Sequence, residues 1–93
     1  MPERGPYRVE AMPAARRDLQ ALTRVERDTR VRIDTAILAL ASDPRPHGSI
    51  KLQGSEFYRV VVGDYRIIYS VDDGERMVLL LRIRHRREVY RDY

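Results

Sequence analysis

Apolar residues return along this chain with two different periods, and the change of period divides it into a helical part and a strand-rich part. Ala15, Leu19 and Leu22 follow one another at spacings of four and three, and apolar residues return to one side again over Val25–Ala41. This is the helical period. From Tyr58 onward the period is two, which is typical of strands with one buried face. The pattern predicts an α+β chain in which a helical hairpin precedes a sheet.

Proline and glycine mark the ends of these elements. Pro13 suits the first turn of a helix, where its missing N–H would have no partner in any case. The segment 42–49 contains two prolines and a glycine and ends the second helix. Ahead of Pro13, alternation over Tyr7–Ala11 predicts a short N-terminal strand. The later strands are expected over 58–62, 65–71 and 76–84. They form a three-stranded antiparallel meander, and the N-terminal strand joins the same sheet as a fourth.

Turn lengths decide which strand residues share a face. Gly63–Asp64 is typical of a two-residue hairpin loop. The face expected to form the core then carries Tyr58, Val60, Val62, Tyr65, Ile67, Tyr69 and Val71. The opposite face carries Arg59, Val61, Arg66, Ile68 and Ser70.

The next turn, Asp72–Gly74, can be read in two ways. A three-residue loop with Gly74 in the left-handed conformation adds Met77, Leu79, Leu81 and Ile83 to the core face. It also places Arg82 and Arg84 on the face of Arg59 and Arg66. A two-residue loop would reverse this parity and bury both arginines. We favour the three-residue loop because each buried large apolar side chain stabilises by about 1.5–3 kcal/mol.

Length and composition narrow the class of protein. Ninety-three residues, of which 43% are hydrophobic and 34% charged, predict one globular domain over 1–93. No apolar run approaches the roughly 20 residues that cross a bilayer. The first residues lack the apolar stretch of a secretory signal, and the chain has no cysteine. We therefore expect a cytoplasmic protein with no membrane association, no metal site and no cofactor.

Positive charge is concentrated near the C-terminus. Of 18 basic residues, 17 are arginine, and the net charge of +4 is carried by residues 82–91. Such a concentration is typical either of an anion-binding surface or of a solvated edge. Arginines from several strands suit a polyanion, and Tyr90 beside them could stack an unpaired base of RNA.

The residues also limit the chemistry. No Walker loop or dinucleotide-binding glycine pattern is present, and the two histidines, His47 and His85, do not have metal-ligand spacing. Phosphoryl transfer without a metal is still possible if the 2'-OH of a ribose attacks the neighbouring phosphate of the RNA chain. That reaction needs a base, cations over the developing charge and an acid. Arginine can supply the cations but not the base, because it stays protonated.

Three segments, Lys51–Gly54, Tyr58–Tyr69 and His85–Tyr90, together resemble the RelE/ParE superfamily of toxins from bacterial type II toxin-antitoxin pairs. The arginine-rich ending that closes in Tyr90 is similar to the RelE branch. This resemblance implies a RelE-like fold and an mRNA interferase, which enters the ribosomal A site and cleaves the codon by 2'-OH attack. It also implies a cognate antitoxin, the ribosome and mRNA as partners. The alternative is a ParE-like toxin that poisons DNA gyrase without nuclease activity.

The resemblance also implies roles for individual residues. Arg59 and Arg66 match phosphate-contacting positions, Tyr90 matches the base-stacking tyrosine, and the arginine acting as acid falls within 84–87, with Arg86 as the first choice. The position of the expected general base is Val61, which cannot accept a proton. His85 is the hypothesis for the missing acid or base, and the alternative is a surface histidine. Further RNA-binding candidates are Lys51, Arg82, Arg84 and Arg87.

Overall fold

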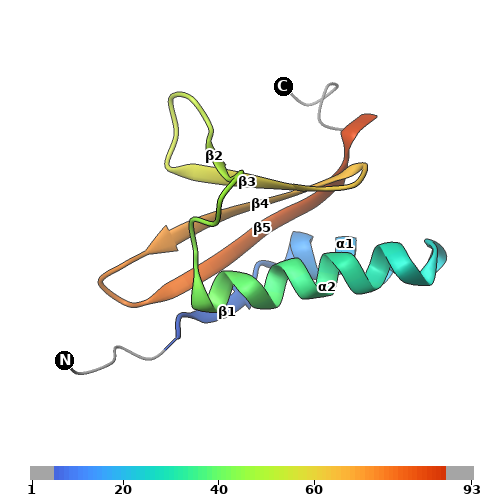
Figure 1. Cartoon of the computed structure of the whole chain (residues 1–93), viewed down its shortest axis with the longest axis horizontal. Coiled ribbons are helices and arrows are strands. Elements are labelled where there is room, and N and C mark those ends of the chain that lie inside the picture. The colour runs from blue at the N-terminus through green and yellow to red at the C-terminus, as the bar shows by residue number, and fades with distance from the viewer. Residues whose placement is uncertain (1–5, 88–93) are drawn as a thin grey trace.

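The computed structural model describes residues 6–87, apart from the side chain of Thr23, as two α-helices against one side of a five-stranded sheet (Figure 1). In chain order the elements are β1 (Arg8–Ala11), α1 (Pro13–Ala21), a short 3-10 helix (Leu22–Arg24), α2 (Arg27–Ser42), β2 (Ile50–Lys51), β3 (Phe57–Val62), β4 (Tyr65–Asp72) and β5 (Met77–His85). The strand order is β1-β5-β4-β3-β2, with β1 parallel to β5 and all other neighbours antiparallel. The expected α+β architecture is confirmed.

The sheet has one strand more than the sequence pattern predicts. β2 contributes only two residues, Ile50 opposite Arg59 and Lys51 opposite Tyr58. Two residues are too few to show an alternating pattern, so the segment reads as part of a loop. The N-terminal strand β1 does join the sheet, along the outer edge of β5.

The core lies between the helices and one face of the sheet. Pro13 occupies the first turn of α1, as its missing N–H predicts. Ala15 of α1 and Ile33 and Leu40 of α2 are fully buried, which confirms the helical stripes. They pack with the strand residues Val60, Val62, Ile67, Tyr69, Val78, Leu80 and Ile83. Because α1 and α2 both cover this face, neither of them lies on the opposite face of the β3–β5 meander within residues 6–87, and we call that opposite face the open face (Figure 1).

The β3–β4 hairpin has the predicted register. Val62 lies opposite Tyr65 across the two-residue turn at Gly63–Asp64, and Gly63 has a φ of 59°. A positive φ carries little steric penalty for glycine, which explains its place in so short a turn. Val61 is consequently opposite Arg66, with both side chains on the open face.

The β4–β5 turn differs from the prediction. Asp72 pairs with Met77, so four residues form the turn, and the left-handed residue is Arg76 (φ 52°) rather than Gly74. The guanidinium of Arg76 lies over the ring of Tyr7, 4.6 Å from its centroid, in a cation–π contact. The assignment of Met77, Leu79 and Leu81 to the core is therefore wrong. One extra turn residue reverses the parity and buries Val78 and Leu80 instead.

A β-bulge in β5 then restores the predicted faces. Tyr69 pairs with Leu80 while the preceding Ile68 pairs with Arg82, so Leu81 is an extra residue without a partner in β4. An extra residue of this kind changes the parity of every residue after it. Ile83 is buried as predicted, and Arg84 lies opposite Arg66.

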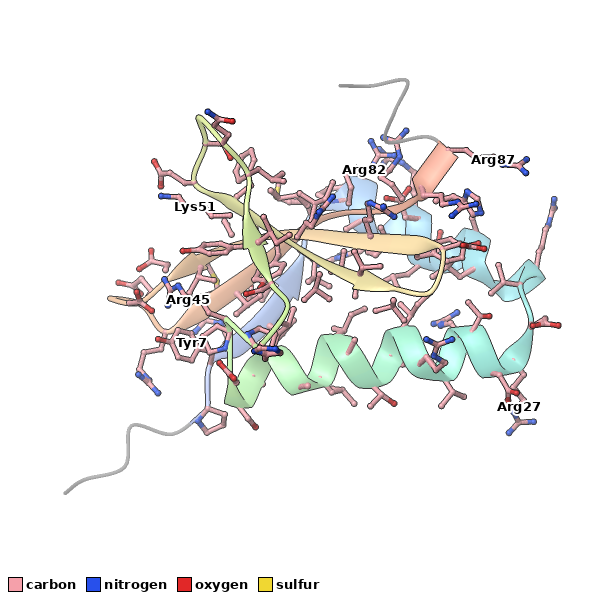
Figure 2. All side chains as sticks on the ribbon, turned by 45° about the horizontal axis from the view of Figure 1, so that its top comes forward. Tyr7, Arg27, Arg45, Lys51, Arg82 and Arg87 are labelled. Atoms are coloured by element: carbon pink, nitrogen blue, oxygen red, sulfur yellow. The ribbon has the colours of Figure 1, made fainter. Side chains whose placement is uncertain are left out.

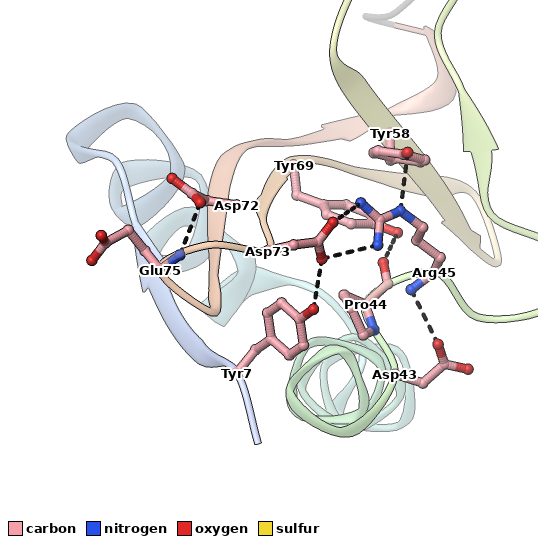
Figure 3. A network of polar contacts seen from close by, with 9 residues as sticks. All are labelled: Tyr7, Asp43, Pro44, Arg45, Tyr58, Tyr69, Asp72, Asp73 and Glu75. Carbon is pink, nitrogen blue, oxygen red and sulfur yellow. Dashed lines mark hydrogen bonds and ion pairs between the residues drawn. The ribbon is translucent and has the colours of Figure 1, made fainter. Parts of the chain in front are cut away.

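A polar network fixes the end of α2 to the sheet (Figure 3). Arg45, in the α2–β2 connection, donates two hydrogen bonds to Asp73 (3.2 and 3.0 Å) and one to the hydroxyl of Tyr58 (3.0 Å). The Tyr7 hydroxyl donates to the same carboxylate at 2.6 Å. Tyr69 adds a hydrogen bond to the carbonyl of Pro44 at 2.8 Å. The network joins three segments that are distant in sequence, namely the entry to β1, the α2–β2 connection and the β4–β5 turn.

This network predicts a stability difference that depends on pH. Hydrogen bonds from Arg45 and then Tyr7 lower the pKa of Asp73 below its ordinary value of 3.8. The folded state therefore gains stability from ionised Asp73 above that value and loses it as the pH falls through the lowered pKa. Asp73→Asn is expected to lower the melting temperature at pH 6, and the difference from wild type should shrink below about pH 4.

Thermal unfolding of both proteins from pH 2 to 7 measures this difference. Glu56→Gln, at an exposed acid, is the control and should follow the wild-type curve throughout. A difference between Asp73→Asn and wild type that stays constant over the whole range would contradict the assigned role of Asp73.

Candidate functional site on the open face of the sheet

Three arginines come together on the open face. Arg66 of β4 lies directly opposite Arg84 of β5. Arg59 of β3 lies opposite Ile68, which is two residues from Arg66 on the same face of β4. Opposite side chains in adjacent strands have Cβ atoms about 4.5–5.5 Å apart, and diagonal neighbours are about 7–8 Å apart. We refer to Arg59, Arg66 and Arg84 as the arginine cluster.

The cluster surrounds a buried apolar residue. Ile68 is only 4% exposed although it lies on the open face, outside the core formed with the helices. Its ladder partners are Arg59 in β3 and Arg82 in β5. The Nε atoms of Arg59 and Arg84 are buried. The side chains of Arg59 and Arg84 therefore lie against the protein at least as far as Nε.

The charge of the cluster suits an anion. Among residues 6–87, neither Arg59 nor Arg66 has a hydrogen bond or an ion pair at its guanidinium. Arg66 and Arg84 place two like charges directly opposite each other, an arrangement that by itself disfavours sheet pairing. Guanidinium groups donate bidentate hydrogen bonds to phosphate oxygens and remain charged at all ordinary pH values. The arrangement can hold a phosphate and stabilise negative charge that develops on it.

Arg82, expected beside the cluster, is instead bound to α1. Its Nε and Nη2 atoms donate to the carboxylate of Asp18 at 2.8 and 3.2 Å. Asp18 also accepts the backbone N–H of Ile83 at 2.9 Å, at the edge of β5 beyond the end of β1. The ladder position of Arg82 is on the open face, as predicted, but its charge is paired with Asp18. Its role is therefore to connect α1 to β5.

Arg86 and Arg87 follow the end of β5 and do not join the cluster. The backbone N–H of Arg86 donates to the carbonyl of Asp64 at 2.7 Å, and its Nε lies 3.8 Å from the Asp64 carboxylate. These contacts fix Arg86 to the β3–β4 turn. Arg87 is exposed and points away from the end of β5 (Figure 2). The structure thus brings Arg84, and not the first choice Arg86, to Arg59 and Arg66.

Lys51 and His85 belong to the other face. Lys51 pairs with Tyr58, whose ring packs against the helix-side core, and it lies at the far edge of the sheet (Figure 2). His85 pairs with Tyr65, and the two rings meet edge to face with centroids 5.3 Å apart. Nδ1 of His85 accepts the backbone N–H of Arg87 at 3.2 Å. The predicted proton-transfer role of His85 is therefore not supported by its placement. Tyr90 lies outside the described residues.

Two residues beside the cluster were missed by the sequence analysis. Phe57 begins β3 on the same face as Arg59, and Ile50 of β2 lies opposite Arg59. Both are exposed apolar side chains. Extending the alternation of β3 back by one residue would have placed Phe57, whereas nothing in the pattern predicts Ile50, because β2 itself is not visible there. In the described part of the chain, no helix is both long and apolar enough to cross a membrane.

Known proteins resemble this chain both in sequence and in fold. A family model described as the ParE toxin of the type II toxin-antitoxin system parDE matches residues 9–90. Toxin RelG of Mycobacterium tuberculosis is 31% identical over 87 residues, covering 92% of this chain and 98% of RelG. The archaeal RelE–RelB complex from Pyrococcus horikoshii OT3 contains a chain that superposes with a TM-score of 0.74 at 29% identity, covering 87% of this chain and 96% of that one. The RelBE2 complex of M. tuberculosis gives a TM-score of 0.72 at 25% identity, covering 86% and 98%.

These matches, together with the helix-backed sheet and its arginine cluster, define a toxin of a type II toxin-antitoxin system. Within that class the chain belongs to the RelE/ParE superfamily, and the resemblance drawn from its sequence is confirmed.

Proposed function

We propose that this toxin is a ribosome-dependent endoribonuclease that cleaves mRNA in the A site and thereby stops translation in the cytoplasm. The observation that carries the proposal is the arginine cluster, in which three cations from three strands lie together on the face opposite α1 and α2. The similarity to Toxin RelG and to the RelE chain of the P. horikoshii complex supports the same reading.

The proposed reaction is an internal phosphoryl transfer. The ribose 2'-oxygen forms a bond to the adjacent phosphorus, the bond from phosphorus to the 5'-oxygen breaks, and a 2',3'-cyclic phosphate and a 5'-hydroxyl result. The 2'-OH loses its proton, and the leaving oxygen gains one. Negative charge builds on the non-bridging oxygens during this exchange, so we assign Arg59 and Arg66 to those oxygens. We place Arg84, beside Arg66, near the leaving oxygen, in the role for which the resemblance implies an arginine within 84–87 and for which Arg86 was the first choice.

The cluster supplies charge but no proton acceptor. Val61 lies opposite Arg66, where the resemblance implies a base, and its side chain is exposed and not ionisable. His85 is on the other face of the sheet. We therefore propose that this toxin contributes positioning and charge stabilisation, and that the proton of the 2'-OH leaves to a group outside the arginine cluster.

A cognate antitoxin is the proposed partner that controls the toxin. The solved relatives from P. horikoshii and M. tuberculosis are toxin-antitoxin complexes. An acidic amphipathic helix or extended segment would complement the arginine cluster and exclude mRNA from it. In this proposal one surface serves two polyanionic partners, so antitoxin and mRNA compete for it.

Primer extension on a translated mRNA after induction of the toxin tests the proposal. We expect cuts within codons at the A site that disappear when translation initiation on that mRNA is blocked. Purified toxin added to programmed ribosomes should produce the same cuts with 2',3'-cyclic phosphate ends. Intact mRNA in both assays would contradict the proposed activity.

Gyrase poisoning is the second candidate function, and the match of residues 9–90 to the ParE family model favours it. A gyrase poison would produce double-strand DNA breaks and filamentous cells, with mRNA left intact. The third case is a toxin that has lost its activity, which we consider because Val61 replaces the expected base. Such a toxin would bind its antitoxin and produce neither effect. The two readouts, DNA breaks and mRNA cuts, therefore separate the three cases.

A further inference from the structure

The open face carries exposed apolar residues directly beside the arginine cluster. Phe57 is 41% exposed, and Ile50 is 48% exposed. Phe57 and Arg59 occupy successive positions on one face of β3, so their Cα atoms are about 7 Å apart. Ile50 lies opposite Arg59 on the neighbouring strand. We call Ile50 and Phe57 the apolar shelf.

Phe57 is not part of the hydrophobic core, so packing against the helices does not explain an aromatic residue at this position. The residue across from it in β4 is Ser70, a small polar side chain on the open face, and neither helix reaches this face. A single exposed apolar residue needs no explanation, but two adjacent ones bordering a cation cluster form a surface suited to a ligand. A ligand that fits this surface has an apolar face and a negative charge about 7 Å apart, which is the spacing between Phe57 and Arg59.

The backbone of Phe57 is fixed on both sides. Its N–H donates to Oγ of Ser55 at 3.1 Å, and its carbonyl accepts the N–H of Leu52 at 2.8 Å. Oγ of Ser55 in turn donates to the carbonyl of Leu52 at 2.9 Å. The β2–β3 turn therefore holds the ring at a set position relative to Arg59, with only the two side-chain torsions of Phe57 free. A preorganised aromatic ring loses little entropy when a ligand stacks on it.

We propose that the apolar shelf is a base-stacking subsite for unpaired RNA, in which Phe57 stacks one base while Arg59 holds an adjacent phosphate. This inference rests on the proposed nuclease function. Base–aromatic stacking tolerates any base, because every base presents a π face. The subsite therefore determines how tightly the mRNA is held and leaves the codon preference to other contacts. The proposed stack is separate from the one expected of Tyr90.

Single-turnover cleavage of mRNA on programmed ribosomes, measured against toxin concentration, tests the subsite. Phe57→Leu removes the ring but keeps an apolar side chain, and it should raise the toxin concentration at half-maximal rate about 5- to 150-fold, the range expected for one lost stack. The maximal rate should change little, because the arginine cluster is intact. Phe57→Trp is the matched variant and should keep the wild-type value or improve on it.

The outcomes separate this inference from the proposed function. If wild-type toxin cleaves and Phe57→Leu matches it at every concentration, the subsite is wrong and the nuclease function stands. If wild-type toxin cleaves nothing, the proposed function fails, and the subsite fails with it. If Phe57→Leu cleaves normally but binds its antitoxin at least 10-fold more weakly, the apolar shelf is a protein-docking surface and the RNA assignment is overturned. Matching melting temperatures for the variants confirm that each is folded.

Discussion

Replacing Arg66 by methionine is expected to slow cleavage of ribosome-bound mRNA by about 10²–10³-fold, the usual effect of removing one donor to a developing oxyanion. Methionine keeps a long apolar stem beside the buried Ile68, so the domain should stay folded. Arg59→Met should have a similar effect. The measurement is the maximal single-turnover rate, with circular dichroism and thermal unfolding of each variant as the check on folding.

Three variants at the end of β5 separate the arginine cluster from its neighbours, one inside the cluster and two outside it as controls. Arg84→Met should lose activity with Arg66→Met, since the two residues are ladder partners. Arg86→Ala and His85→Gln should stay within about threefold of wild type, because Arg86 is tied to the β3–β4 turn and His85 faces the helices. Full activity of Arg66→Met in a folded protein would remove the arginine cluster from the mechanism. A large loss in His85→Gln alone would restore the proton-transfer role that the sequence suggested.

The second large effect concerns stability. Leu80→Ala is expected to lower the free energy of unfolding by about 2–5 kcal/mol, because Leu80 is 2% exposed in the helix-side core and its truncation leaves a cavity. Leu81→Ala should lower it by less than about 1 kcal/mol, since the bulged residue is only partly buried and has no partner in β4. Urea unfolding of the two variants and the wild type measures both differences.

The two neighbouring leucines also test the register of β5. If Leu81→Ala proves the more damaging substitution, the three-residue turn favoured from sequence would be correct, and the bulge would be wrong. Equal losses would indicate that the strand does not hold a single register.

Much of the fold follows from local pattern. The two helices and the four longer strands are visible as changes of period, and the turn at Gly63 fixes the β3–β4 register because a two-residue loop has few solutions. The β4–β5 register could not be predicted in this way. It includes a four-residue turn with Arg76 in the left-handed conformation and a bulge at Leu81, and the alternating pattern marks neither of them.

The candidate site was predicted in part. Alternation alone places Arg59 and Arg66 on one face. It also places Arg84 there correctly, because the extra residue in the β4–β5 turn and the extra residue at the bulge each reverse the parity of β5 and so cancel. The pairing of Arg82 with Asp18 could not be seen, since it requires knowing that α1 packs beside β5. The placement of Arg86 and His85 away from the arginine cluster could not be predicted, because both follow the alternating part of β5, where the pattern no longer tells which side a residue faces.

The bulged leucine also affects how this chain should be compared with its relatives. Without Leu81, the ladder from Leu80 to Arg84 would be regular and every later side chain would keep its face. Loss of any of the residues 77–80 would instead exchange the inward and outward sets of that stretch. We therefore expect a deletion at Leu81 to disturb β5 less than a deletion elsewhere in the strand, and an alignment with its gap elsewhere would place Arg84 one position away from its structural counterpart.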